Sequence, residues 1–158
     1  RMGLTPIGLA ARDTLRFEMG YCLYGNDIDE TTTPLEAGLG WTVKLDKGDF
    51  VGRDALVAQK QSGIPRRLVG LRPQDERAIP RKGYTIQSGT KTVGHVTSGT
   101  FAPSMELGLG MGYVESSLSG PGSSVTIDVR GKDVPAGVTA LPFYTRGSRP
   151  AAGRKKVS

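Results

Sequence analysis

The chain has 158 residues, 37% of them hydrophobic, which is enough for one ordinary core or for a small domain joined to part of another. No apolar run approaches the roughly 20 residues of a membrane helix, and the single cysteine, Cys22, excludes an intrachain disulfide framework and a multi-thiolate zinc site. The formal charge of +6 does not indicate nucleic acid, because five basic residues lie in an aromatic-free tail and the other 16 nearly balance 15 acidic residues.

The first third of the chain mixes helix and strand patterns. Residues 6–19 carry apolar side chains at mostly helical spacing, with Asp13 and Arg16 as a surface pair, and Gly20 is a natural end to this predicted helix. The run Thr33-Pro34-Leu35-Glu36 is typical of a helix start, so a short helical turn should follow it. Residues 41–45 alternate between apolar and polar side chains, which predicts a half-buried strand. Residues 53–61 are good helix formers.

The pattern changes after Pro65, where we place the boundary between residues 1–64 and a second unit, residues 65–145. Short apolar runs separated by turn residues predict six strands, at residues 66–72, 83–87, 92–98, 108–115, 123–130 and 133–140. Residues 88–91 and 131–133 have the chemistry of hairpin turns. We therefore predict an α+β, mainly β chain that ends in a small antiparallel six-stranded β-barrel, followed by a basic, frayed tail over residues 146–158.

The first third cannot form a sheet alone, because it offers two helices and one predicted strand in about 62 residues. We expect its partners in residues that precede Arg1.

No complete catalytic constellation is visible in the sequence. His95 lacks a second histidine or a paired nucleophile and is interpreted as a strand-surface residue, and Cys22 lies in an apolar run typical of a packed thiol. The glycine-rich runs at 98–100 and 108–112 do not match a phosphate loop, so we interpret their glycines as bulge and turn residues. The carboxylates of one loop, Asp27, Asp29 and Glu30, lack the ligand order of a calcium loop, and we interpret them as a solvated acidic loop.

Arg12 and Asp13 follow a small, flexible run, residues 8–11, near the front of the first predicted helix. A guanidinium and exposed amides at such a position can bind an anionic or carbonyl-rich ligand. By pattern alone, however, an ordinary surface or buried ion pair is the favoured interpretation.

Several motifs, in order and at matching spacing, closely resemble the glycine-cleavage T-protein family. The first is the run from Gly8 to Ile28 (GLAARDTLRFEMGYCLYGNDI). It is followed by TPLEAGLGW from Thr33, KGDFVGRDAL from Lys47, and GHVTSGTFAPS from Gly94. VPA from Val134 and LPFY from Leu141 resemble the family's C-terminal end, so the resemblance covers the chain to about residue 146.

The resemblance implies the C-terminal portion of a three-domain aminomethyltransferase of glycine catabolism and one-carbon metabolism. Such an enzyme takes the aminomethyl group from the lipoyl arm of the H-protein and passes its carbon to tetrahydrofolate, giving 5,10-methylenetetrahydrofolate and ammonia. Arg12 matches the family's substrate-binding arginine, and Arg146 matches, less securely, the arginine after the terminal motif. The expected partners are the H-protein and the N-terminal half of the same protein, with no nucleic acid and no membrane. The expected location is the cytoplasm in a bacterium or the mitochondrial matrix in a eukaryote.

The family's catalytic aspartate lies in the N-terminal half, and no residue here corresponds to it, so we expect the isolated chain to be inactive. We consider three alternatives. The folate domain of dimethylglycine- or sarcosine-oxidising enzymes shares the block at 34–56, although the run at 23–28 favours the T-protein. The folate-binding iron–sulfur maturation protein is expected to have Lys-Gly-Cys-Tyr at 47–50, where this chain has Lys-Gly-Asp-Phe, and this difference counts strongly against it. The third alternative is a non-catalytic folate-binding or scaffold module.

Overall fold

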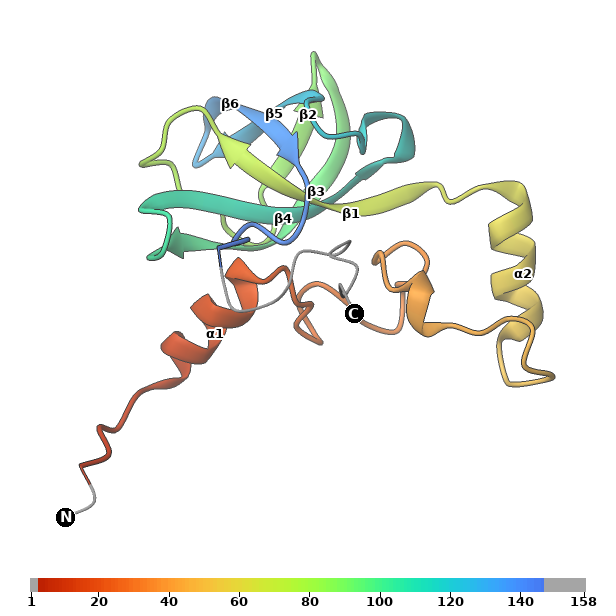
Figure 1. The fold of residues 1–158 in the computed structure, drawn as a ribbon. Coiled ribbons are helices and arrows are strands. Elements are labelled where there is room, and N and C mark those ends of the chain that lie inside the picture. The colour runs from red at the N-terminus through yellow and green to blue at the C-terminus, as the bar shows by residue number, and fades with distance from the viewer. Residues whose placement is uncertain (1–2, 147–158) are drawn as a thin grey trace, which may run out of the picture.

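The computed structural model describes residues 3–146 and is dominated by one closed β-barrel (Figure 1). All neighbouring strands pair antiparallel in the order β1-β4-β3-β2-β5-β6, and β6 returns to pair with β1. The strands are β1 (Arg66–Pro73), β2 (Thr85–Ser88), β3 (Lys91–Ala102), β4 (Leu107–Glu115), β5 (Ser124–Val129) and β6 (Lys132–Thr139). The predicted six-stranded barrel is confirmed, and β3 is longer than predicted because residues 99–102 continue to pair with β4.

The barrel closes around apolar side chains that alternate along its strands. Alternation places every second residue of a strand on the inner face, where it is removed from water. The largest buried cluster is Val69, Leu71, Ile86, Val93, Val96, Val114, Val125, Ile127, Ala136 and Val138. The core therefore depends on β-branched residues, which favour strands.

Four glycines of the barrel lie where backbone segments meet closely. A Cβ atom at Gly94 would overlap the carbonyl oxygen of Tyr113, and a Cβ at Gly112 would lie 2.6 Å from that of His95. A Cβ atom at Gly99 would lie 2.1 Å from the Pro80 carbonyl oxygen, and one at Gly108 would lie 2.2 Å from that of Ala78, both in the segment that precedes β2. The interpretation of the glycine-rich runs as bulge and turn residues is wrong at Gly99, Gly108 and Gly112, because these glycines lie inside strands where a neighbouring backbone approaches closely.

The helix α1 (Leu9–Glu18) packs its last turn against one end of the barrel. Phe17 is 1% exposed and stacks on Phe143, with ring centroids 5.2 Å apart. The predicted apolar face is not the one that contacts the barrel, because Leu9 and Leu15 are 82% and 62% exposed. The helix is also shorter than predicted, since it begins after Gly8.

The segment between the helices has little regular structure. Thr33 and Glu36 form the predicted reciprocal cap, with each backbone amide donating to the other side chain at 3.2 Å. Residues 34–38 then form turns, and a 3₁₀ turn, η1 (Gly40–Thr42), follows. The predicted strand at 41–45 is wrong, because a strand needs a hydrogen-bonded neighbour and no described segment pairs with these residues.

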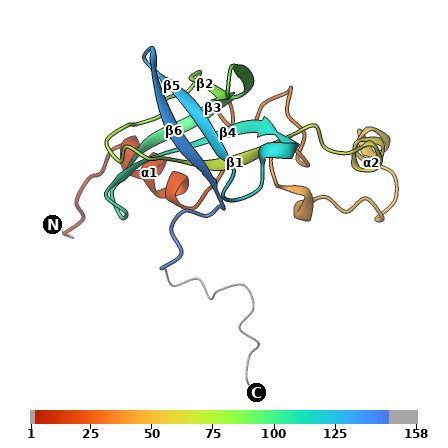
Figure 2. The same cartoon turned by 90° about the horizontal axis from the view of Figure 1, so that it is seen from above.

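The helix α2 (Arg53–Ser62) confirms the prediction at 53–61 and stands to one side of the barrel in both ribbon views (Figures 1 and 2). Left-handed glycines flank it, Gly52 with φ +88° and Gly63 with φ +95°. None of its residues is buried. No helix among residues 3–146 is long and apolar enough to cross a membrane.

Candidate functional site

The helix α1 presents two arginines one turn apart in different environments. The Arg12 side chain is exposed and has no hydrogen bond or ion pair to the described residues. Arg16 is largely buried and pairs with Asp13 and Asp27, each at 2.7 Å. The predicted pair of Asp13 and Arg16 is confirmed, and Arg16 also holds the helix to the rest of the protein, whereas Arg12 is the exposed arginine of α1.

Asp27 is buried, with 1% of its surface exposed, and it joins three parts of the chain. Its carboxylate accepts hydrogen bonds from Arg16, from the Leu23 amide at 2.9 Å and from the Thr97 hydroxyl at 2.6 Å. The interpretation of this loop as a solvated acidic loop is therefore wrong at Asp27. A buried carboxylate needs a paired cation and donors for its oxygen atoms, and Asp27 has both.

A β-bulge in β3 brings Thr97 to Asp27. The register between β3 and β4 shifts between Val96 and Ser98, so Thr97 is the additional residue on its strand. At a bulge, the side chain points in a direction that differs from the regular in-and-out alternation of a strand. Tyr113, on the neighbouring strand, donates its hydroxyl to the Asp27 carbonyl oxygen at 2.8 Å. Burial is the main reason that the pKa of Tyr113 rises to about 12.

The other two carboxylates of the loop, Asp29 and Glu30, are exposed, as predicted. The hydroxyl and the amide of Thr31 donate to the Asp29 carboxylate and lower its pKa. No group of three or more His, Cys, Asp or Glu side chains within residues 3–146 could hold a metal ion.

Two further buried carboxylates connect α1 and the turn at 34–38 to the barrel. Glu18 accepts a hydrogen bond from the Ser104 amide at 2.8 Å, which fixes the turn between β3 and β4. Glu36 lies 3.4 Å from the guanidinium of Arg66 in β1, and its carbonyl oxygen accepts from the Leu68 amide. These carboxylates are structural, because protein donors occupy them.

Cys22 and His95 have the roles that the sequence predicts. Burial raises the pKa of the Cys22 thiol, which keeps it protonated and weakly nucleophilic at neutral pH. His95 lies on the outer surface of β3. Among the residues that the structure describes, neither has the partners that a catalytic nucleophile or base requires.

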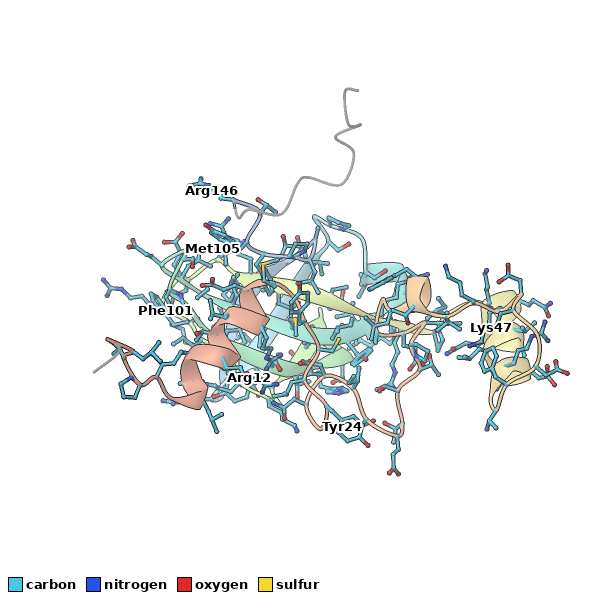
Figure 3. The ribbon with its side chains drawn as sticks, turned by 60° about the horizontal axis from the view of Figure 1, so that its bottom comes forward. Arg12, Tyr24, Lys47, Phe101, Met105 and Arg146 are labelled. Carbon is cyan, nitrogen blue, oxygen red and sulfur yellow. The ribbon has the colours of Figure 1, made fainter. Side chains whose placement is uncertain are left out.

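Arg146 lies apart from Arg12. It lines a cavity of about 460 Å³ together with Arg72, Met105, Phe143 and Tyr144, and Arg12 does not line this cavity. Figure 3 shows Arg12 at α1, the helix to which it belongs, and Arg146 at another edge of the molecule. The described residues therefore do not bring the two predicted folate-binding arginines together. The rest of the predicted basic tail, residues 147–158, lies outside the described residues.

The sequence did not indicate the contacts of Asp27, because Thr97 lies 70 residues away along the chain. The one available signal was the position of Arg16, a basic residue on the helix face that also carries Asp13. A single sequence contains no pattern that pairs a loop carboxylate with a distant strand residue.

Comparison with known proteins identifies the family. The model of the glycine cleavage T-protein C-terminal barrel domain matches residues 66–145, and that of the GCVT N-terminal domain matches residues 1–47. An aminomethyltransferase from Halothermothrix orenii is 54% identical over 142 residues, which is 90% of this chain and 40% of that protein. One from a Nostoc species is 51% identical over 93% of this chain and 39% of that protein.

A crystal structure of the glycine cleavage system aminomethyltransferase T from Bartonella henselae superimposes with a TM-score of 0.83 at 41% identity. The match covers 87% of this chain and 39% of that chain, so this chain spans about 40% of the length of its relatives. Both the barrel and the helical segment before it are shared with these proteins. The chain therefore belongs to the glycine-cleavage T-protein family, with residues 66–145 corresponding to its C-terminal barrel domain.

Proposed function

We propose that this chain is the C-terminal part of a tetrahydrofolate-dependent aminomethyltransferase of the glycine cleavage system. The complete protein would take the aminomethyl group from the lipoyl arm of the H-protein and pass its carbon to tetrahydrofolate. The products would be 5,10-methylenetetrahydrofolate and ammonia. Membership of the family carries this proposal, because the relatives bear the name aminomethyltransferase.

Arg12 is our first candidate for a folate-binding residue. Its guanidinium is exposed, and none of the described residues occupies its donors, whereas Arg16 on the same helix is fully engaged. A free guanidinium can donate two parallel hydrogen bonds to a carboxylate or to the carbonyl-rich pterin. The network around Asp27 supports this role, since it fixes the orientation of the helix that carries Arg12.

Arg146 is a second candidate and would contact a different part of the ligand, because it lines a separate cavity. The catalytic aspartate is assigned to the N-terminal half, as the resemblance implies. A general acid or base must lie within hydrogen-bond reach of the reacting amine. Residues 1–158 would therefore supply part of the folate site but no turnover of their own.

The experiment measures methylenetetrahydrofolate and ammonia formed by the full-length protein from aminomethylated H-protein and tetrahydrofolate. Arg12→Ala should raise the KM for tetrahydrofolate roughly tenfold or more, which is the scale of one lost charge-assisted interaction. Arg67→Ala is the matched control, since Arg67 is another exposed arginine, on β1, with no ion-pair partner in residues 3–146.

Absence of both products with the intact protein would refute the proposed function. An unchanged KM in Arg12→Ala would refute only the role of Arg12. Turnover by the separate 158-residue chain would refute the assignment of the catalytic carboxylate to the other half.

A further inference from the structure

A small cationic cavity lies at the junction of α1, the segment before β2, and β3. Its volume is about 160 Å³. Three basic side chains, three hydroxyl groups and one carboxylate contribute to its lining: Arg16, Arg81, Lys82, Thr97, Ser98, Thr100 and Asp13. The proposed function uses none of these residues as a ligand contact.

Two of the three cations are not neutralised by the protein. Arg16 is paired with Asp13 and Asp27, so its charge is compensated. Arg81 and Lys82 form no ion pair within residues 3–146. Lys82 donates only to neutral oxygens, the Gly25 carbonyl at 2.5 Å and the Asn26 amide oxygen at 3.0 Å.

Arg81 makes one weak contact with the protein, a hydrogen bond to the Gly99 carbonyl at 3.4 Å. Its backbone position is nevertheless fixed, because the preceding Pro80 is buried and packs closely against Gly99. A cation on a fixed backbone with weakly engaged donors is suited to binding an anion with little loss of conformational entropy.

Hydroxyl groups complete the polar lining. Ser98 is 4% exposed, and its oxygen accepts a hydrogen bond from Arg16 at 3.1 Å. A hydroxyl can donate as well as accept, and within residues 3–146 no acceptor takes the Ser98 proton. Thr100 adds another hydroxyl, whereas the Thr97 hydroxyl is already donated to Asp27. The Asp13 carboxylate does not oppose an anion with a free charge, because it lies 2.7 Å from Arg16.

We propose that this cavity binds one small oxyanion, a carboxylate or a phosphate group, between Arg81 and Lys82. The volume fits a single such group and is below the roughly 300 Å³ at which sites for whole drug-sized ligands begin. The oxyanion has two possible sources, a free anion or a carboxylate of the folate substrate. The site itself does not depend on the proposed function.

The experiment is a calorimetric titration of the full-length protein with inorganic phosphate, at constant ionic strength adjusted with chloride. We expect saturable binding with one phosphate per chain. Arg81→Gln/Lys82→Gln should weaken this binding at least roughly tenfold, because both charge-assisted contacts are lost. Lys82→Arg keeps the charge and should retain binding.

The matched control is Arg77→Gln/Lys132→Gln, which removes two exposed cations outside the cavity and changes the net charge equally. It should retain phosphate binding. Absence of saturable binding by the wild-type protein, or equal loss in the two double variants, would overturn the proposal. If the Arg81→Gln/Lys82→Gln protein is unfolded, phosphate binding by the single variant Arg81→Gln decides the question. This variant should fold, since Arg81 makes one weak hydrogen bond with the described residues.

Competition distinguishes the two sources. If phosphate raises the KM for tetrahydrofolate in the wild type but not in Arg81→Gln/Lys82→Gln, the site receives a carboxylate of the substrate. If phosphate binds the wild type without affecting this KM, the ligand is a separate small anion. Both results support the oxyanion site, and they are independent of whether Arg12 binds folate.

Discussion

Asp27 is the residue on which the junction between α1 and the barrel depends most. Its side chain is fully buried, and its charge is compensated by Arg16, itself 12% exposed. Removal of one charge from a buried pair leaves the other charge uncompensated, which costs about 3–5 kcal/mol. We therefore predict that Asp27→Asn lowers the free energy of unfolding by this amount, measured by urea denaturation.

Asp29→Asn in the same loop is the control. Asp29 is exposed, and within residues 3–146 its carboxylate accepts hydrogen bonds only from Thr31, so its substitution should change the denaturation midpoint little. Equal midpoints for the two variants would contradict the structural role of Asp27.

The raised pKa of Tyr113 predicts that the protein becomes less stable at alkaline pH. Its pKa is about 12 in the folded protein against 10.0 for the free side chain, mainly because the phenol is buried. Because the folded state holds this proton more tightly than the unfolded state, the stabilisation is fully present below pH 10 and is lost as the pH rises to 12. Tyr113→Phe should show a smaller loss of unfolding free energy across this interval, measured by denaturation at a series of pH values.

Tyr24→Phe is the control for other alkaline titrations, since Tyr24 is 68% exposed. Its stability should fall with pH as in the wild type. Parallel curves for wild type and Tyr113→Phe would refute the assignment. Below pH 10, Tyr113→Phe should still be the less stable protein, because the hydrogen bond to Asp27 is absent.

Among the elements, the pairing of β3 with β4 requires glycine at one position of β3. A Cβ at Gly94 would overlap the Tyr113 carbonyl oxygen, which is backbone and cannot rotate away. We predict that Gly94→Ala costs more than about 3 kcal/mol of unfolding free energy or prevents folding. Circular dichroism and thermal denaturation measure the effect.

Gly137→Ala in β6 is the matched control, because no atom lies within 4 Å of a Cβ there and its φ is not positive. This variant should be as stable as the wild type or slightly more so, since alanine reduces the entropy of the unfolded chain. A Gly94→Ala protein as stable as Gly137→Ala would contradict the close approach of the two strands.

The sequence predicted those elements whose signals are local. The turn at residues 88–91 joins β2 to β3, because glycine and polar residues favour tight turns. The turn predicted at residues 131–133 also joins β5 to β6, but it lies at residues 130–131, since Lys132 and Asp133 already pair in β6. The reciprocal cap of Thr33 and Glu36 is local for the same reason. The strand predicted at residues 41–45 was wrong because alternation describes a half-buried surface but supplies no pairing partner.

For the whole molecule, apolar burial is uneven. The barrel has a closed core, whereas large apolar side chains are exposed on α1 and on the segments before and after it. They include Leu4, Ile7, Leu9, Leu15, Trp41 and Val51, with exposures between 62% and 104%. Exposed apolar surface of this kind is typical of a contact surface. That the first third packs against residues preceding Arg1 stays a prediction.

The sequence by itself determined the barrel, its six strands, α2, and the family motifs, including the run that contains Arg12. Strand alternation, turn residues and helix formers act over a few neighbouring positions, so one chain is enough to recognise them.

Only the tertiary structure decided which of the charged side chains are structural and which are free. It buried Arg16 with Asp27 and Thr97, left Arg12 exposed, separated Arg146 from Arg12, and placed Arg81 and Lys82 around one cavity. The physical reason is that the energy of a charge depends on its distance from other charges and from water, and chain closure sets those distances between residues far apart in the sequence.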